Sequence, residues 1–124
     1  MQAVLLIFVG GGIGSLLRYG LSRLVNNNVI SHFPFGTFIV NIIGCFFIGF
    51  FIFYTERYQD TVQEWRLFLV TGLCGGFTTF SAFSMENVQL MTDGRIGVAF
   101  LYIIASVALG LLATYGGLLA GKSI

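Results

Sequence analysis

Four long apolar segments, separated by short polar ones, run through the 124 residues of the chain. Each reaches the roughly 20 residues that an α-helix needs to cross a bilayer. No segment shows the alternation of apolar and polar positions that marks a transmembrane β-strand. The pattern therefore predicts an all-α membrane protein with a single four-helix transmembrane domain over residues 1–124. The predicted spans cover about residues 3–25, 35–54, 67–91 and 95–121.

Composition supports a chain embedded in the bilayer. Hydrophobic residues make up 56% and charged residues only 9%, against roughly 25% charged residues in a soluble domain. The net charge of +1 argues against nucleic acid as a partner. The only histidine, His32, falls in a predicted loop, and no Ser-His-Asp or Cys-His arrangement is available. We therefore expect a multi-pass protein of the cell inner (plasma) membrane that is not an enzyme.

The charges at the ends of the spans bear on orientation. A cytoplasmic side normally carries an excess of Lys and Arg, and neither side of this chain has one. Two readings stay open: the chain inserts both ways and pairs with an inverted copy, or one loop charge dominates and fixes one orientation. The side holding both termini has Arg57, Arg66 and Lys122, and the opposite side has Arg23 and Arg95, with Arg18 deeper in the first span.

Glycines indicate close helix packing. Glycine pairs spaced by four residues let helix backbones approach each other in lipid, where apolar burial gives no drive between helices. A chain with 17 glycines forms some such pairs by chance, but pairs in three spans favour a tightly packed bundle. These pairs are Gly10 and Gly14, Gly72 and Gly76, and Gly117 and Gly121.

The middle of the third span is a poor membrane helix. Residues 72–84 contain three glycines and four hydroxyl residues. We expect the helix to break here at mid-membrane, where freed backbone groups must be satisfied by protein, water or an ion. Broken helices at bilayer depth commonly form ion sites. A kink that serves packing alone is the alternative.

Two features near this break could line an ion path. Phe80 and Phe83 share one helix face, and ring edges are electropositive, so they could guide an anion without a fixed charge. Packing against lipid or core is the alternative for these rings. Asn41 lies in mid-span with Thr37 one turn earlier. Its amide serves either an aqueous path or an interhelical hydrogen bond.

Charged and hydroxyl residues complete the candidates. Arg18 either extends to the interface or concentrates anions at a vestibule. Glu86 follows the break by about a turn and could cap a helix or pair with such a cation. The fourth span supplies the hydroxyls of Tyr102, Ser106 and Thr114.

Three ordered motifs resemble the fluoride-channel family (Fluc, also called CrcB), and the likeness covers nearly the whole chain. Ala82 departs from the family, in which many members have Thr at this position. The motifs are Gly11-Gly12-Ile13-Gly14 through Arg18-Tyr19, Gly36-Thr37 with Val40-Asn41 and Gly44, and Gly75-Gly76-Phe77-Thr78-Thr79-Phe80-Ser81 with Phe83.

The resemblance implies an antiparallel, dual-topology homodimer with two passive pores that export cytoplasmic fluoride. It also implies a structural sodium ion (Na+) at the dimer centre, held by the backbone carbonyls of Gly75 and Thr78 in both copies. By the same likeness, the pore would be lined by Asn41, Phe80 and Phe83. The expected polar track comprises Ser81, Thr37, Tyr102, Ser106 and Thr114, and Arg18 and Glu86 are expected at a vestibule or in a structural role.

Two other function classes are alternatives for a chain of this kind. A small multidrug-type cation exporter needs an acidic residue inside a helix, but the first span has none and Glu86 is poorly placed for this role. A membrane subunit that only scaffolds others would have no use for Asn41 or for the hydroxyl-rich break.

Overall fold

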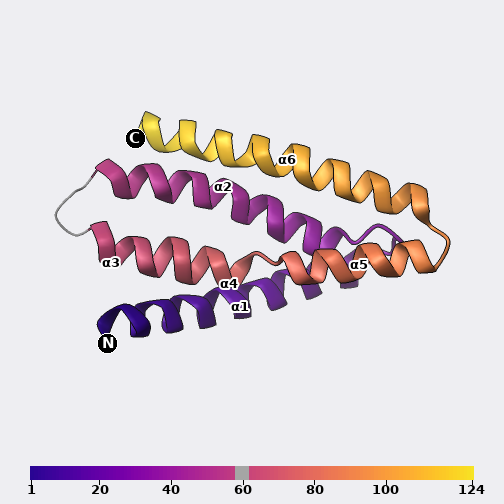
Figure 1. Ribbon diagram of the computed structural model, residues 1–124, viewed down its shortest axis with the longest axis horizontal. Helices are drawn as coiled ribbons and strands as arrows, with labels where there is room; N and C mark the ends of the chain where they lie inside the picture. The colour runs from indigo at the N-terminus through magenta and orange to yellow at the C-terminus, as the bar shows by residue number, and fades with distance from the viewer. Residues whose placement is uncertain (58–61) are drawn as a thin grey trace.

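The computed structural model describes residues 1–57 and 62–124. Asp60, in the polar segment between the second and third predicted spans, therefore lies outside the described residues. Within these ranges the chain is helical, without strands, and four helical stretches are long and apolar enough to cross a membrane. The prediction of an all-α fold with four helices of membrane-spanning length is thereby confirmed. They run side by side along the long axis of the molecule (Figure 1). Their bounds are Gln2–Asn28, Phe35–Arg57, Val62–Thr92 and Ile96–Ser123.

The third span is interrupted, as predicted. Thr78 and Thr79 have extended backbones, with φ/ψ of −83°/155° and −148°/119°. The eight residues of η1 before the break form a π-helix, a rare geometry that often occurs at functional sites. The elements are α1 (Gln2–Asn28), α2 (Phe35–Arg57), α3 (Val62–Arg66), η1 (Leu67–Cys74), α4 (Gly75–Phe77), α5 (Phe80–Thr92) and α6 (Ile96–Ser123).

Two helices extend beyond the predicted spans. The first continues through the three asparagines at 26–28, past the predicted end near residue 25, where the Val29 amide donates to Val25 at 2.9 Å and the Asn28 side chain donates to the Leu24 carbonyl at 2.7 Å. α2 likewise continues to Arg57, past the predicted end near residue 54, and α3 begins at Val62, before the predicted start near residue 67. Glu, Gln and Arg are good helix formers, so a helix continues past the apolar span.

The three glycine pairs all lie at helix contacts. A Cβ on Gly10 would lie 3.1 Å from the Gly72 Cα, and one on Gly76 would lie 3.0 Å from the Gly11 Cα. These contacts join α1 to η1 and α4. A Cβ on Gly117 would lie 2.8 Å from the Phe46 backbone carbon, which joins α6 to α2. The bundle therefore relies on direct backbone approach, as expected for helices in lipid.

The turn between α5 and α6 is formed at Asp93 and Gly94. Gly94 adopts a left-handed φ of 79°, its amide donates to Met91 at 3.1 Å, and the Arg95 amide donates to Leu90 at 2.8 Å. These two bonds form the Schellman motif that ends many helices at glycine. The turn directs α6 back along α5, so that Leu90 packs against Tyr102.

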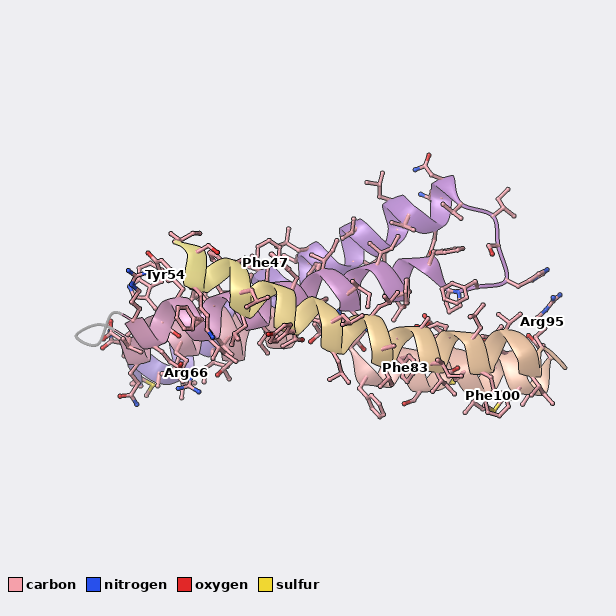
Figure 2. All side chains as sticks on the ribbon, turned by 90° about the horizontal axis from the view of Figure 1, so that it is seen from above. Phe47, Tyr54, Arg66, Phe83, Arg95 and Phe100 are labelled. Atoms are coloured by element: carbon pink, nitrogen blue, oxygen red, sulfur yellow. The ribbon has the colours of Figure 1, made fainter. Side chains whose placement is uncertain are left out.

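Both termini, the end of α2 and the start of α3 lie at one end of the molecule, and the α1–α2 linker and the α5–α6 turn lie at the other (Figure 1). Arg66 and Arg95 mark these two ends in Figure 2. The basic residues at the ends of the spans are therefore divided between the two sides as the sequence predicts. Both ends therefore carry basic residues.

Candidate ion pathway

Asn41 is bonded to the break in the third span. Its Nδ2 donates to the Thr79 carbonyl at 3.1 Å, and its Oδ1 accepts from the Thr79 amide at 2.8 Å. One side chain of α2 thus satisfies both backbone polar groups of the extended residue. Such groups are costly to leave unpaired at bilayer depth. The interhelical hydrogen bond, one of the two interpretations left open for Asn41, is therefore present.

The break leaves carbonyl oxygens on its α4 side. In a continuous helix the Gly75 carbonyl would accept from the Thr79 amide, which instead donates to Asn41. The Thr78 carbonyl would accept from the Ala82 amide, which instead donates to the Thr79 hydroxyl at 3.2 Å. Both carbonyls predicted to hold sodium have therefore lost their helical donors.

The other side of the break is a helix N-terminus. Thr79 is the N-cap of α5, and Phe80 and Ser81 are its first two residues. Amides in these positions have no acceptor within their own helix, and the helix dipole favours negative charge there. The two half-helices thus present opposite polarity at the same depth.

The break opens on a cavity of about 320 Å³. A larger cavity, of about 480 Å³, lies elsewhere in the molecule. The smaller cavity brings together four of the predicted pore residues, from α2, α5 and α6. None of the side chains around it is ionisable as a carboxylate or an amine. Its lining comprises Asn41, Cys45, Ile48, Thr78, Thr79, Phe80, Phe83, Ser106 and Val107.

The two phenylalanines of this cavity differ in their surroundings. Their ring centroids are 5.7 Å apart. Phe80 is 78% exposed, whereas Phe83 packs against Tyr102 with centroids 5.0 Å apart. In Figure 2 Phe83 lies between the ends marked by Arg66 and Arg95. A large exposed ring beside a backbone break is available to line a path or to meet a second copy.

Glu86 connects three helices. Its Oε1 accepts from the Thr37 hydroxyl at 2.6 Å, and its Oε2 accepts from the Tyr102 hydroxyl at 2.7 Å. Thr37 is 8% exposed and Tyr102 is fully buried. The carboxylate thereby joins α2, α5 and α6, although these donors are 49 and 16 residues away in the sequence. The expectation that Glu86 pairs with a cation is not met among the described residues.

The larger cavity, of about 480 Å³, lies at the α1–α2 linker end. Thr37 and Glu86 form part of its wall, and the Phe83–Tyr102 ring contact and the Tyr102–Glu86 hydrogen bond link this wall to that of the cavity at the break. Its lining comprises Asn26, Val29, Ile30, Ser31, His32, Phe33, Pro34, Thr37, Glu86, Gln89, Leu90, Asp93 and Arg95.

Residues 5–118 match the family model described as CrcB-like protein, Camphor Resistance (CrcB). The chain belongs to this family. It is 48% identical to a protein of Flavobacterium psychrophilum over 124 residues, which is 100% of both chains, and 49% identical to one of Phocaeicola vulgatus over 118 residues, which is 95% of this chain and 97% of the relative. A protein of Oceanobacillus iheyensis is 44% identical over 94% of this chain and 89% of its own length. All three bear the name fluoride-specific ion channel FluC. The family and the four spans make this chain a multi-pass membrane protein.

The remaining candidates of the CrcB-like chain lie outside the two cavities. The Thr114 hydroxyl donates to the Gly110 carbonyl at 3.0 Å within α6. The Ser81 hydroxyl lies 3.2 Å from that of Thr79. Arg18 is half-buried on α1 and forms no ion pair with any described residue.

Sequence reasoning missed two features of the site. Cys45 lines the smaller cavity one turn after Asn41, and this spacing could have pointed to it. The link between Thr37, Glu86 and Tyr102 joins distant segments, so no local spacing could have revealed it.

Proposed function

We propose that this chain is a passive fluoride channel of the cell membrane. The observation that carries the proposal is near full-length identity of 48% and 49% to proteins named fluoride-specific ion channels. The family assignment sets aside the cation-exporter and scaffold alternatives. Export of fluoride from the cytoplasm, down its gradient, is the corresponding role in the cell.

The cavity at the break suits fluoride. Fluoride is small, strongly hydrated and a strong hydrogen-bond acceptor, so a path must replace its water with donors. The α5 N-terminus, the Ser106 hydroxyl and the second Asn41 Nδ2 proton are such donors, and the edges of Phe80 and Phe83 add weak positive potential. The lining has no basic side chain that would hold the ion. Donors without fixed charge allow an anion to bind and to leave.

The polar track continues in this proposal through Tyr102 and Thr37 to the larger cavity. Both hydroxyls donate to Glu86. A fluoride ion on this route competes with the carboxylate for one of these protons, so Glu86 orients the donors and also weakens their hold on the ion. Thr114 is proposed to extend the polar track, and Arg18 to serve at a vestibule or in a structural role; both lie outside the two cavities.

A structural sodium ion fits the carbonyls of Gly75 and Thr78. Both have lost their helical donors, and carbonyl oxygens are suitable ligands for a hard cation. No cluster of three acidic, histidine or cysteine side chains occurs among residues 1–57 and 62–124 to compete for a metal. Two carbonyls from each copy would hold the ion at the centre of a dimer. Thermal stability measured in sodium and in N-methylglucamine tests this: equal stability contradicts it.

The dimer is proposed to be antiparallel. The two ends of the chain carry similar numbers of basic residues, and 78% of the Phe80 surface is exposed beside the break. A cysteine appended after Ile124 can be labelled with a membrane-impermeant maleimide in intact and in permeabilised cells. Dual topology predicts about half of the label in intact cells. Full or absent labelling there contradicts dual insertion.

The channel itself is tested with purified protein in liposomes. Fluoride efflux is followed with a fluoride electrode, and chloride efflux is measured in parallel. Rapid loss of fluoride with retention of chloride supports the proposal. No fluoride efflux from folded protein overturns it.

A further inference from the structure

The chain has two cysteines in different surroundings. Cys45 lines the cavity at the break together with Asn41 and Ser106. Its Sγ lies 3.5 Å from where a Cβ on Gly110 would be, so the sulfur lies against the α6 segment that follows Ser106. Cys74 is 3% exposed and borders a different, wholly apolar cavity with Phe47 and Phe77. Of these two thiols, only that of Cys45 lies beside the proposed ion path.

The cavity also contains an unsatisfied hydroxyl. The Ser106 Oγ is buried and has no hydrogen-bond partner among the described residues. Nearby groups are already used: Asn41 binds both polar groups of Thr79, and the Thr79 hydroxyl accepts from Ala82. Buried hydroxyls nearly always have a partner. An anion in the cavity would supply the acceptor that Ser106 lacks.

We infer that Cys45 is a further pathway-lining residue and the site at which a small thiol-directed reagent blocks the channel. The inference rests on the proposed fluoride channel. The thiol is a weak hydrogen-bond donor, and it lies one helical turn from Asn41 on the same helix, in the cavity that Ser106 also lines. It therefore extends the set of neutral donors that face the ion. A group added to its sulfur enters the space that the ion needs.

Methyl methanethiosulfonate is a suitable probe because it is small, neutral and soluble in lipid. The Cys45 thiol loses its proton to solvent, and its sulfur attacks the methylthio sulfur of the reagent. A sulfur–sulfur bond forms, the bond to the sulfonyl sulfur breaks, and methanesulfinate leaves. The product carries one methylthio group, which a reductant removes.

The experiment compares fluoride efflux before and after the reagent in the native chain, in Cys74→Ala and in Cys45→Ser, each relative to its own untreated rate. Intact-protein mass reports how many methylthio groups were added. We expect treatment to slow efflux by about tenfold or more in the native chain and in Cys74→Ala, with recovery after reduction. Efflux through Cys45→Ser should stay unchanged by treatment.

Three results overturn the inference: no modification of Cys45 in Cys74→Ala, modification of Cys45 without slower efflux, or equal inhibition of Cys45→Ser. The untreated proteins test the channel separately. If they conduct fluoride but Cys45 modification has no effect, the proposed function stands and only the role of Cys45 fails. If the untreated native chain does not conduct, the proposed function itself fails.

Discussion

The amide of Asn41 pairs with the backbone of Thr79 as a neighbouring strand would, donating to its carbonyl at 3.1 Å and accepting from its amide at 2.8 Å. This pairing satisfies both backbone polar groups of Thr79, so the third span can be extended there. It also frees the Gly75 carbonyl, while the Thr79 hydroxyl, by accepting from the Ala82 amide, frees the Thr78 carbonyl. The side chains of Asn41 and Thr79 therefore set the polarity of the break, and the proposed fluoride and sodium sites both depend on it.

Asn41→Asp tests this dependence. The carboxylate can still accept from the Thr79 amide, but its second oxygen then faces the Thr79 carbonyl without a proton to donate, and it places negative charge in an anion path. We expect fluoride efflux to fall by at least about tenfold and the melting temperature in detergent to decrease. Asn27→Asp, on the exposed end of α1, is the control and should keep both. Native-like efflux through Asn41→Asp would contradict the assignment of Asn41 to the path.

The role of the Phe80 ring in conduction can be tested separately from its contribution to packing, because the ring is exposed. Phe80 is 78% exposed and Phe8, on α1, is 76% exposed, so replacing either ring removes little packing within one chain. Phe80→Ile removes a ring edge from the proposed path and should reduce fluoride efflux by about tenfold or more. Phe8→Ile should leave efflux within about twofold of native. Equal efflux from the two variants would show that the Phe80 ring has no role in conduction.

Much of the architecture could be predicted, because lipid makes strong demands on sequence. Spans must be apolar over their whole length, so hydropathy located all four. Close packing in lipid needs small residues, so glycine pairs such as Gly10 and Gly14 marked true helix contacts. Glycines and hydroxyls at residues 72–84 marked the break, because a regular membrane helix has no need of them.

The remaining features depend on tertiary contacts. Nothing local to Glu86 indicates that its two donors are Thr37 and Tyr102, since helix packing alone brings these positions together. The π-helix of η1 also escaped prediction, because its sequence would equally suit an α-helix. The extension of α1 through Asn28, where the Val29 amide still donates to the Val25 carbonyl, also could not be predicted from the weak helix propensity of asparagine.

Thr37 and Tyr102 should be energetically coupled through Glu86. Each hydroxyl donates to a different oxygen of the same carboxylate, so removal of one changes what the other contributes. Thr37→Val, Tyr102→Phe and the double variant form a cycle, with the free energy of unfolding measured in detergent. We expect a coupling energy of about 0.5–3 kcal/mol. Strict additivity would mean that the two hydroxyls act independently.

Two adjacent glycines of α6 test the packing of α6 on α2. A Cβ on Gly117 would lie 2.8 Å from the Phe46 backbone carbon and 3.0 Å from the Phe50 amide nitrogen, whereas a Cβ on Gly116 meets nothing within 4 Å. Backbone atoms cannot move aside as a flexible side chain can, so Gly117→Ala must separate the helices. We expect it to destabilise the protein by about 1–3 kcal/mol, while Gly116→Ala is neutral or stabilises by up to about 1 kcal/mol through helix propensity. The cavity at the break is bounded by both helices, at Asn41 on α2 and Ser106 on α6, so Gly117→Ala should also slow fluoride efflux. Similar melting temperatures for the two variants would contradict direct backbone contact between α2 and α6.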